Sequence, residues 1–428
     1  MSAQTLLLSN AVIHRISDDT LPSGQILIQD GKIAAVGANV SAANAQVLDL
    51  QGQHLYPGLI ALNTSLGLTE IAAVRATQDS SEAGDYTPDV ESWVSANPDS
   101  ELIPVARANG IAYFEPVPQG GIVAGQSGLV ASDGWTTEQR TIKHPLTLHV
   151  FWPAQELTIS TRARGRGKRE GKSLDEQAKE RRTKVRALED FFDEAKAYAR
   201  GKDATGSATA SPARTVPAGD GKPFQIVPAW EAMLPYVRGQ LPITIQANEI
   251  RQIKSAVSWA ATNNYKIIVA GARDAWMAAD LLASRNIPVI YANTFARPVR
   301  DTSSYDVHFK AADVLRRAGV KVIFNFGSDS FNAAMSRNLP YAASQAVAFG
   351  LPEIEALKGL TLYPAQIAGV ADRLGSLEVG KEATIVATDG SILDQRANVK
   401  HMWLAGKEVS LESRHTRLYE KYKNRPRP

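Results

Sequence analysis

Cysteine is absent from this chain of 428 residues. Disulfide bonds and sites built on a thiolate are therefore excluded, because both require a cysteine sulfur. Long apolar runs are absent as well, since none reaches the roughly 18 residues that a membrane-spanning helix needs. Charge of one sign does not dominate either: 47 basic and 44 acidic side chains leave a formal net charge of +3. We therefore expect neither a nucleic acid nor a membrane as a partner.

What the chain does have is a β-rich stretch at each end. The stretches share short apolar runs broken by turn residues, and they are residues 5–14, 25–36, 46–56 and 377–411. Between them, short apolar segments alternate with helical segments, as in a parallel βα barrel. The sequence therefore predicts an α/β fold. We expect a TIM-like (β/α)8 barrel over residues 57–374 and one small composite β-sandwich built from residues 1–56 and 375–428.

Seven apolar segments are predicted as barrel strands, and an eighth is less clear, near residues 129–131. The seven are residues 59–62, 111–114, 146–151, 243–246, 267–270, 289–292 and 320–326. Helices are expected between them. These are residues 247–263, 274–284, 311–317 and 342–349.

An insertion at about residues 155–225 interrupts this rhythm. Residues 161–172 are rich in Arg and Gly and predict an exposed loop; no aromatic residues interleave there to suggest a nucleic-acid platform. Ser173 and Glu176 match a capping box, which predicts a helix running to about Arg200. Residues 201–222 are rich in Gly, Ala, Ser, Thr and Pro, so we expect a mobile segment.

The run DLQGQHLYPG at residues 49–58 leads into a segment ending Asn63-Thr64-Ser65. It resembles the opening of an amidohydrolase-superfamily barrel, where a DLxGxxVxPG run precedes a strand ending His-x-His. Residues 360–381 and the Gly-Ser-Asp-Ser tetrapeptide around Asp329 also resemble that family. The resemblance implies that Asn63 and Ser65 replace two metal-binding histidines, while Asp329 corresponds to the aspartate after strand eight.

The resemblance also implies a histidine after strand five and another after strand six, where this chain has Gln246 and Ala270. Imidazole is a strong zinc ligand, whereas amide and hydroxyl oxygens are weak ones. We therefore expect the family's divalent metal to be lost and no cofactor to be bound. The pocket would be lined by Asn63, Ser65, Gln246 and Ala270, and Asp329 would be the one candidate catalytic group.

Three other features could contribute to a site. His149 is the one histidine inside a predicted barrel strand, but alternation places it away from the strand end. The glycine-rich segment at residues 115–126 could line a pocket, or it could form ordinary turns. Acidic and basic residues in the loop after the first strand could form a polar network at the barrel mouth, or simply be solvated. They are Glu70, Arg75, Asp79 and Glu82.

Two functions remain open. In the first, a non-catalytic or weakly active barrel acts as partner subunit of an intact amidohydrolase homologue, or binds a small molecule. In the second, an active hydrolase cleaves amide or other non-peptide C–N bonds with Asp329 as general base and without the usual binuclear metal site. The absence of the family's histidine ligands favours the non-catalytic or weakly active barrel. An oligomer is expected in either case.

The compartment is predicted from the amino terminus. MSAQTLLLSN lacks the basic and apolar stretches of an export signal. The small residues after Met1 are nevertheless typical of a signal-cleavage site, and proteins that this chain resembles often begin with a signal peptide. We therefore expect a periplasmic or otherwise exported protein, with a cytoplasmic one as the alternative.

Overall fold

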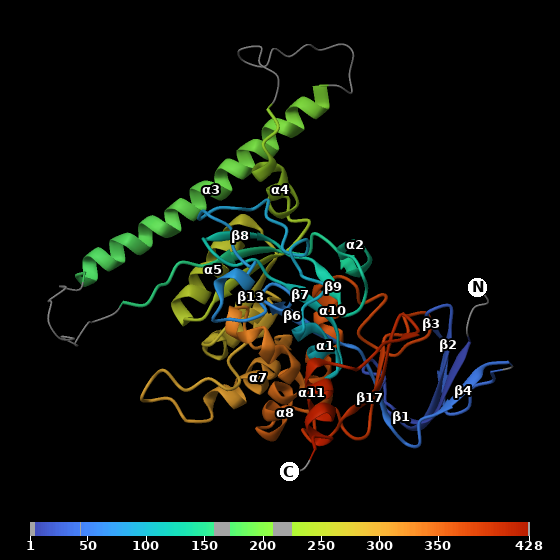
Figure 1. Cartoon of the computed structure of the whole chain (residues 1–428). Helices are drawn as coiled ribbons and strands as arrows, with labels where there is room; N and C mark the ends of the chain where they lie inside the picture. Colours follow the sequence, from blue (N-terminus) through green and yellow to red (C-terminus); the bar gives the residue numbers. More distant parts are fainter. Residues whose placement is uncertain (1–4, 43, 158–171, 209–224, 427–428) are drawn as a thin grey trace.

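The computed structural model describes residues 5–42, 44–157, 172–208 and 225–426. Its strands and helices form a barrel and, at one side of it, a β-sheet domain that carries the amino-terminal end, whereas the chain ends in a helix beside the barrel (Figure 1). The predicted exposed loop lies outside the described residues except for Lys172, and so does most of the predicted mobile segment.

Strands from both ends of the chain form one eight-stranded sheet, in the order β18-β17-β16-β5-β1-β2-β3, with β4 paired to β1. The junction between the two ends is the antiparallel pairing of β5 with β16. A separate core of buried apolar side chains, including Leu8 and Trp403, stabilises this domain. The strands are β1 (Leu6–Ile13), β2 (Leu21–Gln29), β3 (Lys32–Gly37), β4 (Gln46–Asp49), β5 (His54–Pro57), β16 (Ile385–Thr388), β17 (Val399–Leu404) and β18 (Lys407–Glu408).

Parallel strands form the barrel wall. One ladder joins β6 to β7, and a second runs from β11 through β12, β13 and β14 to β15. Each predicted segment overlaps one of them: β6 (Leu59–Thr64), β7 (Ile111–Pro116), β11 (Leu148–Phe151), β12 (Ile243–Ala247), β13 (Ile267–Gly271), β14 (Val289–Tyr291) and β15 (Val322–Phe324). The prediction of a TIM-like barrel with a composite β domain is confirmed, both by these strands and by the structural likenesses reported below.

The eighth predicted segment behaves differently. Residues Leu129–Ala131 do form a strand, β9, but it pairs antiparallel with β7 and with the short β10 (Thr141–Lys143). Next to it, β8 (Val123–Gln126) pairs antiparallel with β11. One parallel strand was expected between β7 and β11. Two short strands lie there instead: β9 pairs antiparallel with β7, and β8 pairs antiparallel with β11.

Helices follow the barrel strands. The helix predicted from residue 247 begins at Ile250, because Glu249 and Gln252 form a capping box there. The helix predicted from residue 274 is divided into η3 and α6. The helices after β12 are α5 (Ile250–Asn263), η3 (Ala275–Ala278), α6 (Ala279–Ser284), α7 (Val307–Arg317), η4 (Ser330–Asn332), η5 (Ala334–Asn338), α8 (Leu339–Ala348), α9 (Glu353–Leu360), α10 (Leu362–Ile367) and α11 (Arg414–Lys423).

The insertion carries the longest helix, α3 (Leu174–Ala208), which extends past the barrel in both directions (Figure 1). Its predicted capping box is confirmed, since Glu176 N donates to Ser173 Oγ at 3.2 Å and Ser173 N donates to Glu176 Oε2 at 2.8 Å. The helix continues past the predicted end near Arg200. Among the helices of the described ranges, none is both long and apolar enough to cross a membrane.

Shorter helices precede the barrel's second half: η1 (Arg75–Thr77), α1 (Leu102–Arg107), α2 (Thr137–Arg140) and α4 (Pro228–Val237). Every residue of β6, β7 and β13 is buried. Strands covered on both faces in this way are normally apolar. A polar side chain within them therefore needs a hydrogen-bond partner inside the protein.

Candidate functional site at the barrel mouth

The carboxyl ends of the barrel strands bring the predicted site residues together. Asn63 lies near the end of β6, Gln246 near the end of β12, and Ala270 in β13 directly beside Gln246 in the strand register. Asp329 lies beyond the end of β15. In βα barrels this end of the strands is where active sites form. Asn63, Gln246, Ala270 and Asp329 therefore all lie at this end of the barrel.

Asn63 and Gln246 contact each other directly. The side-chain amide of Gln246 donates a hydrogen bond to Oδ1 of Asn63. Asn63 is fully buried and has a φ of +56°, a left-handed conformation that Asn adopts more readily than most residues. Its backbone N–H donates to Oε2 of Glu115 at 2.8 Å, whereas its Nδ2 has no hydrogen-bond partner among the described residues.

Ser65 and Asp329 are joined through the backbone. The Ser65 hydroxyl, which is buried, donates to the carbonyl oxygen of Asp329 at 2.7 Å. The Asp329 carboxylate itself is exposed: it accepts from the backbone N–H of Phe331 at 3.0 Å and from the side-chain amide of Asn332. This aspartate therefore caps the short helix η4.

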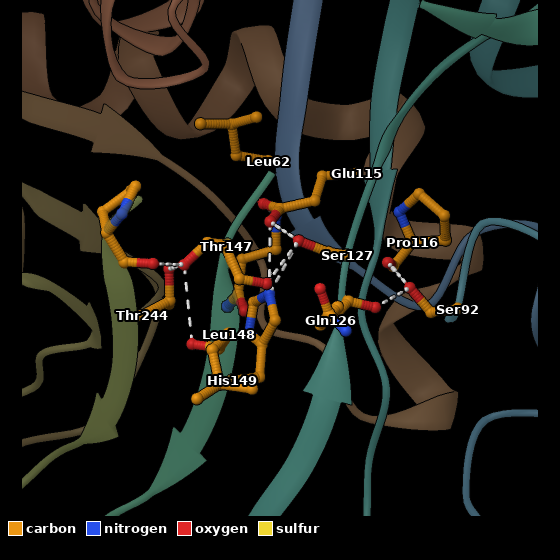
Figure 2. Close-up of polar contacts among 12 residues, drawn as sticks. Leu62, Ser92, Glu115, Pro116, Gln126, Ser127, Thr147, Leu148, His149 and Thr244 are labelled. Carbon is orange, nitrogen blue, oxygen red and sulfur yellow. Dashed lines mark hydrogen bonds and ion pairs between the residues drawn. The ribbon is translucent and has the colours of Figure 1, made fainter. Parts of the chain in front are cut away.

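A buried cluster beneath these residues includes His149, which the sequence singled out, but its grouping with Glu115 and Ser127 was not predicted. Figure 2 shows Glu115 from β7, Ser127 after β8 and His149 from β11 pointing toward one another. The Ser127 hydroxyl donates to Glu115 Oε1 at 2.6 Å. His149 Nε2 lies 3.0 Å from Ser127 Oγ and 3.2 Å from Glu115 Oε1. Through Glu115, the cluster continues to the backbone of Asn63.

The geometry of this cluster differs from a nucleophilic triad. In a triad the carboxylate and the nucleophile bind different nitrogens of the histidine, so that one orients the ring and the other is deprotonated. Here Glu115 and Ser127 both face Nε2 of His149, and its Nδ1 has no hydrogen-bond partner in the described part of the chain. All three side chains are also buried. The cluster therefore satisfies buried polar groups and holds β7 against β11.

Asn325, directly after β15, is a further site residue that the sequence did not predict. It is buried, and its Nδ2 donates to the carbonyl oxygens of Leu62 at 2.6 Å and Asn63 at 3.0 Å. These bonds join β15 to β6, which lie in separate ladders. A polar residue following the apolar run VIF was the available signal.

The other two candidate features have structural contacts. Glu70 accepts hydrogen bonds from Ser100 Oγ at 2.6 Å and Glu101 N at 3.0 Å, while Arg75, Asp79 and Glu82 are exposed. In the glycine-rich segment, a Cβ on Gly125 would lie 2.7 Å from the carbonyl oxygen of Val90. That glycine therefore allows two backbone segments to pack closely.

The donor set at the strand ends does not fit the zinc-type centre that the resemblance implies. Asn63 and Ser65 use their polar groups within the protein, Gln246 offers an amide, and Ala270 offers no ligand atom. Zinc requires three or four nitrogen, sulfur or carboxylate ligands in tetrahedral geometry. Within the described ranges, no three His, Asp or Glu side chains are grouped so as to hold a metal ion.

A βα barrel beside a sheet built from both ends of the chain is the architecture of the amidohydrolase fold. Residues 279–409 match the amidohydrolase family. Over 408 residues the chain is 22% identical to amidohydrolase tasK of Hapsidospora irregularis, covering 90% of this chain and 39% of that protein. It is 26% identical to a dihydroorotase of Bacillus cytotoxicus over 134 residues, 28% of this chain and 30% of that protein. The chain thus spans well under half the length of these curated relatives.

Solved structures agree on the fold. An amidohydrolase from Thermotoga maritima superposes with a TM-score of 0.78 at 22% identity, covering 95% of this chain and 99% of that one. A prolidase complexed with N-methylphosphonate-L-proline gives a TM-score of 0.55 at 16% identity, covering 95% and 99%. These likenesses show the amidohydrolase fold over nearly the whole chain, and the match to the amidohydrolase family itself covers residues 279–409.

Proposed function

We propose that this chain is a superfamily barrel that has lost metal-dependent hydrolysis and acts as the partner of an intact, metal-binding homologue. The observation that carries the proposal is the hydrogen bond between Gln246 and Asn63. Two positions that would hold the metal in the family are bonded to each other, and a third, Ser65, donates to the backbone of Asp329. Without the metal, water is not activated toward a pKa of about 7, so the family's nucleophile is not formed.

The partner role has separate support. More than half of the tasK relative lies outside its match to this chain. A longer polypeptide of that kind has room for a second folded unit joined to the first. We propose that the corresponding unit for this barrel is an amidohydrolase that retains its metal ligands.

A metal-free hydrolase is the competing proposal, and the relatives described as amidohydrolase and dihydroorotase support it. In that case Asp329 would act as general base on amide or other non-peptide C–N bonds. Its carboxylate is exposed and can meet water, but it already accepts two hydrogen bonds from η4. A base held in a helix cap is less available for proton transfer, and for this reason we favour the partner role.

Elemental analysis tests the loss of the metal. Protein purified without chelators should contain well under one equivalent of zinc, manganese, iron or nickel. A family member with an intact His-x-His motif, purified in the same way, serves as the control and should retain its metal. One or more equivalents in this protein would contradict the proposal.

Affinity purification from the native source tests the partner role. The expected result is a second barrel that contains His-x-His, and whose binding is reproduced with the two purified proteins. A homogeneous homo-oligomer that hydrolyses dipeptides or N-acyl amino acids by itself would overturn the proposal and establish the hydrolase.

A further inference from the structure

A cavity of about 690 Å³ opens at the end of the barrel opposite the strand-end residues described above. Its lining includes Pro242, Lys266 and Pro288, which directly precede β12, β13 and β14. In βα barrels this amino-terminal face contributes to stability, whereas chemistry takes place at the other face. A ligand site here is therefore distinct from the family's active site.

The cavity combines an apolar floor with a cationic rim. Its lining includes the buried side chains of Val257, Ile267 and Ile287, together with Lys143, Lys266 and Arg285. No acidic residue lines it. Small-molecule sites typically have this make-up, with mostly apolar walls and a few convergent polar groups, and volumes of about 300–1,000 Å³.

The three cations of the rim have no acidic partner in the described part of the chain. Among the described residues, none of the three makes an ion pair, although Lys143 donates to the carbonyl oxygen of Gly369 at 3.2 Å. An adjoining cavity of about 190 Å³ adds Lys321, which also has no ion pair in the described ranges. Like charges gathered without counter-charges attract an anion.

We propose that this cavity binds a small amphiphilic anion, with its apolar body against the floor and a carboxylate or phosphate head at the cationic rim. Burial of the body supplies most of the affinity, because the free energy scales with the apolar area removed from water. The rim selects the charge of the head group. This site is independent of the proposed partner role.

Fluorescent probes of matched shape test the site. Anilinonaphthalene sulfonate carries an anion, and N-phenyl-1-naphthylamine has the same ring system without one. The expected result is tighter binding of the sulfonate, competition by octanoate or octyl phosphate, and none by octanol. Comparing the two competitors shows whether the head group is a carboxylate or a phosphate.

Variants locate the binding. The double variant Lys266→Gln/Arg285→Gln should bind the anionic probe about tenfold more weakly, because two favourable charge interactions near the surface are lost. Lys254→Gln, on another surface, is the control and should change nothing. Ala261→Trp, which adds bulk to the cavity wall, should weaken the binding of both probes.

Two outcomes would overturn the proposal. In one, the uncharged probe binds as tightly as the sulfonate and neither responds to the lysine and arginine substitutions. In the other, light scattering shows a dimer that the Ala261→Trp change dissociates, which would assign this face to a second copy of the chain.

Discussion

The side chains of Gln246 and Asn63 are hydrogen-bonded across the interior of the barrel. The strands that carry them, β12 and β6, belong to different ladders and are not neighbours in the wall. The bond therefore links opposite sides of the barrel mouth. Asn63 extends the link by donating its backbone N–H to Glu115, so that one continuous set of polar contacts connects β12, β6 and β7.

Removing the amide at this bond should destabilise the protein. Gln246→Ala leaves Oδ1 of the fully buried Asn63 without its donor, which should lower the free energy of unfolding by about 1–3 kcal/mol. Urea denaturation followed by circular dichroism measures the change. Gln395→Ala, at an exposed position, is the control and should have little effect. Equal stability of the two variants would argue that the Gln246 amide does not stabilise Asn63.

Substitution of Glu115 in the buried cluster should lower the free energy of unfolding by more than Gln246→Ala does. Glu115→Ala removes the acceptor for Asn63 N, Ser127 Oγ and His149 Nε2 at once, and should cost about 3–5 kcal/mol of unfolding free energy. Glu115→Gln keeps one acceptor oxygen and should cost less. Denaturation midpoints with unchanged slopes would establish the order of the two variants.

Ser127→Ala separates a structural role from a nucleophilic one. Because Ser127 and Glu115 share the same histidine nitrogen, we expect a stability loss of about 1 kcal/mol and no change in any hydrolysis the protein shows. A turnover that disappears in this variant, while stability is retained, would identify Ser127 as a nucleophile.

Sequence patterns were sufficient to predict most of the barrel wall and the composite domain. Strands such as β6 and β13 are buried on both faces, so they are read directly as apolar segments. The part of the wall between β7 and β11 was not predictable in this way. β8 and β9 are short, and their antiparallel pairing depends on Gly121 and Gly125, which let the chain pack against Asp85 and Val90.

The candidate site was only half predictable. The resemblance placed Asn63 and Gln246 at strand ends because motif positions carry over along the chain. It could not show that the two bond to each other, nor that Glu115 and His149, 34 residues apart, share a hydroxyl between them. Such pairs are set by strand register and barrel closure, which a single sequence does not contain.

The free energy of unfolding should fall in mild acid because of His14. Burial, together with the neighbouring His54, lowers the pKa of His14 from 6.5 to about 4. The unfolded chain therefore takes up a proton that the folded protein does not, and this contribution is lost as the pH falls from about 6.5 to 4. In His14→Phe, which can keep the stacking on Tyr56, the urea midpoint should fall less over that range. His415→Phe, at an exposed position, should behave as the unmodified protein.

Asp329 is the residue on which the two proposed functions differ most. Asp329→Ala removes the cap of η4 and should cost about 1 kcal/mol of stability, whereas Asp329→Asn retains a side-chain oxygen that can accept from Phe331 N. The Asn variant therefore removes the carboxylate as a base with little effect on the fold. If the chain is a non-catalytic partner, metal-free preparations of the Asn variant and the unmodified protein should release product from N-acyl amino acids at the same background rate. A rate at least tenfold lower in the Asn variant, with an unchanged denaturation midpoint, would show that Asp329 acts as a general base and that the barrel still hydrolyses C–N bonds.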